Sequence, residues 1–112
     1  MAKRSLSRRA ARPAPAVPDL DPLVHQRVRL GILSALAAGG ATSFTDLKTG
    51  LDLTDGNLSV HARKLEEAGY VAVSKTTAGA PLTEFSLTTA GRRALTDYLD
   101  QMEAVIQAAR PS

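Results

Sequence analysis

The chain has 112 residues, of which 44 % are apolar, with no cysteine and a formal net charge of +3. One folded domain is expected at this length, and a disulfide framework or a thiolate metal site is excluded. No apolar run approaches the roughly 18 residues that span a bilayer, and prolines interrupt the apolar residues near the start, so we expect a cytoplasmic protein with neither a signal peptide nor a membrane partner.

The charge is divided unevenly along the chain. Residues 1–18 carry five lysines and arginines and no acid, whereas residues 19–112 carry nine basic against eleven acidic side chains, a balance of −2. Three prolines disfavour helix in the first segment and little of it could be buried, so 1–18 is predicted to be a disordered basic tail and 19–112 the folded domain. The tail is either solubilising or a contact to DNA or a membrane surface.

The first half of the domain is predicted to hold two helices and a short extended segment. Apolar residues recur at helical spacing, which predicts a helix over 22–38 that starts at Asp21-Pro22 and stops at Gly39-Gly40. Residues 42–44 are too short for an ordinary strand but could add an edge to a small sheet. Thr45 is then predicted to cap a short helix over 46–51.

The second half shows clearer periodicity. Thr54 is predicted to cap a helix over 54–68 that ends at Gly69. Alternating residues predict strands over 71–76 and 82–87, joined as a hairpin by the turn 77–81. Thr88 is predicted to cap a long helix over 89–109. This order indicates a mainly α fold with a small β-hairpin, of the α+β class.

Two short helices joined by a tight turn, the second with exposed polar residues, suit insertion into the major groove of DNA. The pattern alone also fits a small α+β domain with an ordinary hairpin. The residues from Leu53 to Val71, Leu-Thr-Asp-Gly-Asn-Leu-Ser-Val-His-Ala-Arg-Lys-Leu-Glu-Glu-Ala-Gly-Tyr-Val, resemble the recognition-helix segment of winged helix-turn-helix regulators of the MarR/ArsR type. They are especially similar to the compact group called "winged helix DNA-binding domain". Segments 20–33 and 87–92 look like that group's first helix and the start of its last helix.

The resemblance implies a homodimeric transcription factor with a three-helix core. Helix 54–68 would enter the major groove, the hairpin would be the wing, and a long C-terminal helix would form the dimer interface. The relatives often carry arginine or lysine at the wing tip, whereas here Thr77-Ala-Gly-Ala-Pro81 has no charge. The arginines of the tail 1–18 are therefore predicted to compensate for the uncharged wing by contacting the DNA backbone or a minor groove.

The polar residues of helix 54–68 are the candidate DNA contacts. Asn57 and Ser59 lie near its start, where side chains meet base edges, and asparagine can form two hydrogen bonds with an adenine edge. The alternative for each is a capping or solvated residue. His61 either touches DNA or packs against helix 46–51. Phosphate contacts are expected from Arg63 and Lys64, and weaker ones from Lys48, Thr54 and Lys75.

The last helix carries an apolar stripe that is longer than the domain needs for its own core, which indicates a dimer interface. Its members are Leu95, Tyr98, Leu99, Met102, Val105 and Ile106. Packing within the monomer is the alternative interpretation.

No catalytic set is visible, because the two histidines fall on different predicted helices and no carboxylates cluster. We therefore expect neither an enzyme nor a cofactor. The expected partners are double-stranded DNA, a second copy of the chain and an unknown small-molecule effector. The predicted function is a sequence-specific DNA-binding transcriptional regulator, a repressor; the alternative is a winged-helix protein-interaction module, which the near-neutral body and uncharged tip favour.

Overall fold

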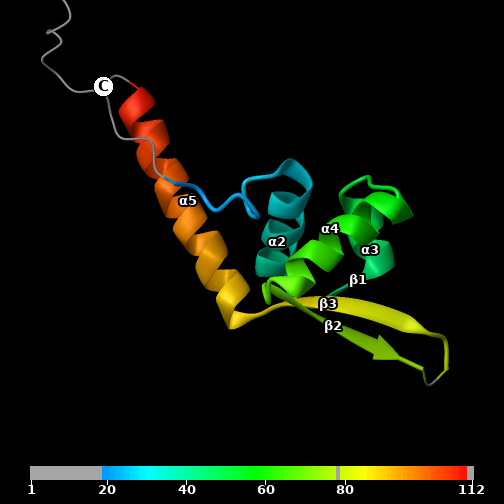
Figure 1. Ribbon diagram of the computed structural model, residues 1–112. Coiled ribbons are helices and arrows are strands. Elements are labelled where there is room, and N and C mark those ends of the chain that lie inside the picture. The colour runs from blue at the N-terminus through cyan, green and yellow to red at the C-terminus, as the bar shows by residue number, and fades with distance from the viewer. Residues whose placement is uncertain (1–18, 78, 111–112) are drawn as a thin grey trace, which may run out of the picture.

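In the computed structural model, which describes residues 19–77 and 79–110, the chain forms four helices and a three-stranded antiparallel sheet (Figure 1). The elements follow in the order α2 (Arg27–Gly39), β1 (Thr42–Ser43), α3 (Phe44–Gly50), α4 (Asp55–Glu67), β2 (Val71–Thr76), β3 (Leu82–Leu87) and α5 (Thr89–Ala109). This is the α+β winged helix arrangement that the sequence predicts. The predicted tail, residues 1–18, lies outside the described residues.

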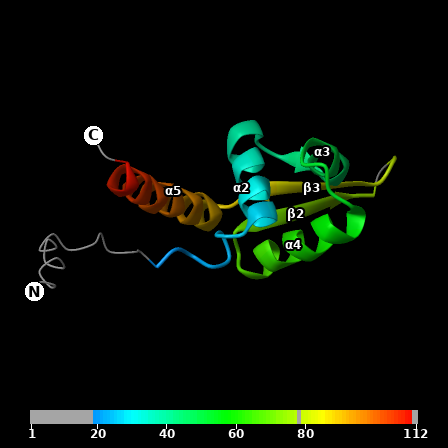
Figure 2. The same ribbon diagram turned by 90° about the horizontal axis from the view of Figure 1, so that it is seen from above.

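The sheet has β3 at its centre, in the order β1-β3-β2. Phe85 of β3 is opposite both Thr42 of β1 and Val73 of β2, so residues 42–43 form the predicted edge. Helices α2, α3 and α4 lie together on one side of the sheet, while the hairpin tip and the C-terminal end of α5 lie at opposite ends of the molecule (Figures 1 and 2).

The core joins α2, α3 and α4 to the sheet. Each large aliphatic side chain in it gains roughly 1.5–3 kcal/mol from leaving water, before chain entropy is counted. The most fully buried are Val24, Ile32, Leu33, Leu36, Leu47, Leu58 and Leu65. This packing fixes α4 and leaves its opposite side free.

The first helix begins later than predicted, at Arg27 rather than residue 22. Residues 21–25 form only a turn, in which Asp21 accepts hydrogen bonds from the backbone N–H groups of Val24 and His25. Gln26 then adopts an extended conformation and caps α2 by accepting a hydrogen bond from the N–H of Arg29. The apolar spacing continues through this break because Val24 is buried in the same core as α2.

The predicted cap of the second helix is also wrong. Ser43, not Thr45, caps α3, because its hydroxyl accepts a hydrogen bond from the N–H of Asp46. Ser43 simultaneously pairs with Glu84 in the sheet. The strand therefore passes directly into the helix, which begins at Phe44, two residues earlier than predicted.

The later elements agree with their predictions. Thr54 caps α4 and Thr88 caps α5, each through a hydrogen bond to a backbone N–H in the first turn. The start of α5 is pressed against the end of α4: the Thr88 hydroxyl donates to Gly69 O at 2.6 Å and the Thr88 N–H donates to Tyr70 O at 3.1 Å. Gly91, in the first turn of α5, lies so close to the backbone of Tyr70 that a Cβ at position 91 would be 2.0 Å from Tyr70 O.

Candidate nucleic-acid interface

Helices α3 and α4 are joined by a turn of four residues, 51–54, which holds α4 at a fixed position. Asp52 occupies the left-handed region at φ 54°, a conformation that aspartate tolerates better than most side chains. The N–H of Leu53 donates to Lys48 O at 2.9 Å and closes the turn. The two helices therefore form a helix-turn-helix unit.

One side of α4 is buried and the other is free. Leu58, Ala62 and Leu65 point into the core. The predicted contacts Asn57, Ser59, Arg63 and Lys64 are all exposed. The fold thus brings four polar side chains from two turns of one helix onto accessible surface.

The start of α4 is organised by Thr54 and by an ion pair. The hydroxyl of Thr54 accepts a hydrogen bond from the N–H of Asn57 at 3.1 Å, so this residue is the helix cap. Lys48 of α3 lies 2.8 Å from the carboxylate of Asp55. The negative charge of that carboxylate also stabilises the N-terminus of α4, which is the positive end of the helix dipole. The predicted phosphate contact from Lys48 therefore competes with an internal partner.

His61 packs against α2, not against the predicted helix 46–51. Its Nδ1 accepts a hydrogen bond from Arg29 Nη1 at 3.1 Å, because a guanidinium can only donate. Arg29 also donates through Nε to Leu23 O at 2.6 Å. Burial, followed by the positive charges of Arg29 and Lys64, lowers the pKa of His61 below its ordinary value of 6.5.

The hairpin contributes Lys75, which is exposed on β2. A hollow of about 280 Å³ separates the hairpin from α4, and Ser59, Arg63 and Lys75 are among its lining residues. Three predicted contacts therefore meet at one groove, with the Glu66 carboxylate also on its edge.

Two residues on the free side of α4 were missed by sequence reasoning. Val60 is 53 % exposed, and Gly56 has open space where a side chain would project. The available signal was an apolar residue outside the stripe formed by Leu58, Ala62 and Leu65. Helical periodicity identifies residues that lie on the buried stripe, so it does not single out an apolar residue on the opposite face.

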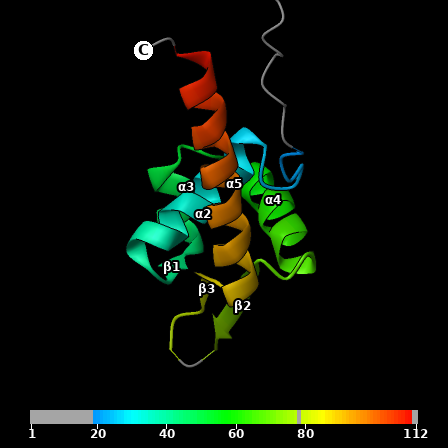
Figure 3. The ribbon, with the colours of Figure 1, turned by 90° about the vertical axis from the view of Figure 1, so that its left-hand side faces the viewer.

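The apolar stripe of α5 divides between two environments. Leu95 and Tyr98 are buried within the chain itself, so they do not lie at a dimer interface as predicted. They are covered because α2 packs against α5. His25 Nδ1 also lies 2.8 Å from the Tyr98 hydroxyl. The remaining members, Leu99, Met102, Val105 and Ile106, lie further along α5. Met102 is half-buried against the core, and the C-terminal end of α5 extends beyond the other helices (Figures 1 and 3). Leu99 and Ile106 are 49 % and 42 % exposed.

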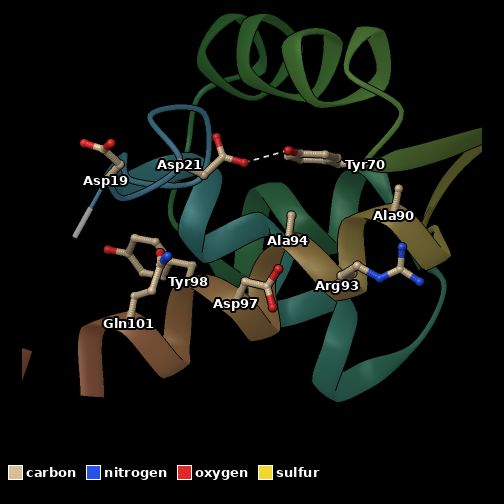
Figure 4. A pocket seen from close by; sticks show the side chains of 9 residues that line it. All are labelled: Asp19, Asp21, Tyr70, Ala90, Arg93, Ala94, Asp97, Tyr98 and Gln101. Atoms are coloured by element: carbon tan, nitrogen blue, oxygen red, sulfur yellow. Dashed lines mark hydrogen bonds between the residues drawn. The ribbon is translucent and has the colours of Figure 1, made fainter. Parts of the chain in front are cut away.

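A second hollow, of about 340 Å³, lies between residues 19–21, Tyr70 and the first half of α5 (Figure 4). The Tyr70 hydroxyl donates to Asp21 Oδ2 at 2.6 Å. This hydrogen bond, then burial, then the carboxylate charge raise the pKa of Tyr70 to about 12. The contact ties the segment before α2 to the end of α4.

Within residues 19–77 and 79–110, no helix is long and apolar enough to cross a membrane. In the same part of the chain, no three histidine or acidic side chains approach one another as metal ligands would.

Known proteins are similar to this chain in sequence and in fold. Residues 28–106 match the family described as "Winged helix DNA-binding domain". The chain belongs to this family. It is 41 % identical over 73 residues to the uncharacterized protein MJ0432 of Methanocaldococcus jannaschii, a match that covers 64 % of this chain and 79 % of that protein.

Solved structures agree with the family. A transcriptional regulator homologue from Pyrococcus horikoshii superimposes with a TM-score of 0.77 at 34 % identity, over 80 % of this chain and 89 % of that one. ZitR of Lactococcus lactis, a zinc-responsive MarR family member, gives a TM-score of 0.61 at 16 % identity over 93 % and 73 % of the two chains, which is a likeness of fold. The winged helix fold of transcriptional regulators is thus common to all three chains.

Proposed function

We propose that this winged helix protein is a sequence-specific DNA-binding transcriptional regulator, a repressor, that acts as a homodimer and not as an enzyme. The observation that carries the proposal is the free side of α4, where Asn57, Ser59, Arg63 and Lys64 are all exposed on a helix whose opposite side is locked in the core. A helix of this kind fits the major groove, which is about 12 Å wide.

Each of these side chains suits a particular contact. Asn57, in the first turn of α4, can form two hydrogen bonds with an adenine edge, and Ser59 can bond either a base edge or a phosphate. Arg63 and Lys64 carry the positive charge that phosphates require. Lys75, across the groove from Arg63, extends this positive surface onto the hairpin.

The second copy of the chain would cover the projecting half of α5. Apolar residues left at the surface on one face of a helix favour a partner helix. On this half of α5, Leu99 and Ile106 are exposed, and Met102 and Val105 are half-buried on the same face. A two-fold dimer would present two α4 helices to half-sites about 34 Å apart, one turn of DNA.

The test begins with selection of tight-binding duplexes from a library whose centre is randomised over about two helical turns. Their affinity for the full chain is then measured at low and high salt. The proposal predicts selection of a defined two-fold sequence, and an affinity that falls steeply with salt as phosphate counterions are released. Failure to enrich any sequence would contradict it.

A protein-interaction module is the second candidate. It is favoured by the carboxylates of Asp55, Glu66 and Glu67, which are exposed on α4 beside the basic residues. Negative charge here opposes DNA binding. A stable protein partner together with no enriched duplex would select this candidate over the first.

A further inference from the structure

The free side of α4 centres on two residues that carry no polar group. Val60 and Gly56 are four residues apart, which places them one turn apart on the same face of the helix. By the same spacing, this face is turned away from the buried residues Leu58, Ala62 and Leu65. Val60 is 53 % exposed, and a Cβ on Gly56 would meet no atom within 4 Å.

Neither residue is explained by the fold. Glycine is a poorer helix residue than alanine, and at position 56 neither a close contact nor a positive φ calls for it. Valine is also a weaker helix former than alanine, and more than half of the surface of Val60 is exposed to solvent and does not pack in the core. Both choices become useful if another molecule approaches this face closely.

We propose that this strip recognises thymine: Val60 packs against the C5-methyl group of a thymine in the major groove, and Gly56 leaves room for the first turn of α4 to approach the base pairs. Thymine alone among the four bases presents a methyl group there. The inference rests on the proposed function and deepens it by naming a base that the half-site must contain.

The surroundings of the strip match that occupant. Asn57, beside Gly56, is suited to adenine, so both readings point to A·T pairs. Arg63 and Lys64 lie one turn beyond Val60, and the three line a hollow of about 410 Å³ together with Ser59 and, at its far end, Glu67. Their charges complement the phosphates on either side of the groove.

Glu67 fixes which half of α4 faces the bases. It lies seven residues beyond Val60, roughly 10 Å along the helix, and its exposed carboxylate would be repelled by phosphates. The N-terminal half of α4, which holds the strip, is therefore the half that enters the groove.

The test uses a duplex selected on the full chain, in which each thymine is replaced in turn by deoxyuridine, which lacks only the methyl group. We expect one position in each half-site where the replacement weakens binding about fourfold, the effect of removing one buried methyl group. Val60→Ala should bind the thymine duplex more weakly and lose the difference between thymine and uracil at that position.

Gly56→Ala provides a second readout. The variant should have an equal or higher melting temperature and yet bind the selected duplex at least several-fold more weakly. Gly39→Ala is the matched control, because Gly39 is also helical with no atom near its Cβ position but lies on α2. It should leave binding unchanged.

The outcomes separate the two proposals. If no duplex is enriched, the proposed function itself fails. If duplexes are enriched but no uracil replacement matters, or if Val60→Ala keeps the full thymine preference, the function stands and the thymine inference is overturned.

Discussion

Arg29 of α2 donates a hydrogen bond from Nη1 to Nδ1 of His61 on α4, at 3.1 Å. This contact holds the imidazole neutral with its proton on Nε2, because a protonated ring has no acceptor left for a guanidinium. It links α4, the helix proposed to face DNA, to α2.

Replacing Arg29 should therefore change the titration of His61. In Arg29→Gln the pKa of His61 should rise, because a positive charge next to the ring is lost, but it should stay below 6.5, since burial and Lys64 still lower it. Nuclear magnetic resonance of the histidine ring protons measures this value, with His61→Gln used to assign the signal.

The sign of the pH dependence follows from the same contact. Because the folded chain takes up the proton less readily than the unfolded chain, stability should fall as the pH drops from 6.5 through the folded pKa. Arg27→Gln, at an exposed position two residues earlier on α2, is the control and should leave the pKa of His61 in place. An unchanged pKa in Arg29→Gln would contradict this account.

The contact between Gly91 and Tyr70 predicts a large effect on stability. A methyl group at position 91 would lie 2.0 Å from Tyr70 O, and this oxygen is held by the N–H of Thr88. Gly91→Ala should lower the free energy of unfolding by about 1–3 kcal/mol or more, as overpacking does. Urea denaturation measures it. Gly39→Ala, with no atom near, should not destabilise the chain; equal effects of both changes would refute the packing argument.

The ion pair at the start of α4 predicts opposite effects on stability and binding. Asp55→Asn removes a favourable charge at the helix N-terminus and should lower stability by about 0.3–1 kcal/mol. It also frees Lys48, 2.8 Å away, and removes a negative charge from the interface, so affinity for DNA should rise roughly two- to fivefold. Fluorescence anisotropy with a selected duplex would show this. Weaker binding would mean that Asp55 itself serves the complex.

The projecting half of α5 predicts how the chain assembles. Leu99→Asp combined with Ile106→Asp places charge on the two most exposed members of the apolar face and should convert a dimer into a monomer. Sedimentation equilibrium gives the mass directly. Thr96→Asp with Gln107→Asp, two exposed polar positions on the same helix, is the control. A monomeric wild-type chain, or a dimeric Leu99/Ile106 variant, would contradict the homodimer.

The sequence predicts best where a structural rule depends on neighbours along the chain. The caps at Thr54 and Thr88, the hairpin strands and the bounds of α5 all follow from local patterns. The start of α2 was missed because Val24 joins the same core from a separate turn. The cap at Ser43 was missed because that residue also pairs with Glu84, which is distant in sequence.

The candidate site shows the same division. Exposure of Asn57, Ser59, Arg63 and Lys64 could be predicted from helical spacing alone. The partner of His61 could not, because Arg29 is 32 residues away. Leu95 and Tyr98 extend an apolar stripe without a visible break, and only the packing of α2 against α5 separates core from free surface.

The most direct test of the central claim is the affinity of the Asn57→Ala, Arg63→Ala double variant for a selected duplex, measured by fluorescence anisotropy. If α4 reads DNA, affinity should fall by at least about thirtyfold while the melting temperature stays close to that of the wild type. Gln107→Ala with Arg110→Ala, exposed at the far end of α5, should bind as the wild type does. Equal affinity of the α4 variant and the wild type would contradict the placement of α4 in the major groove.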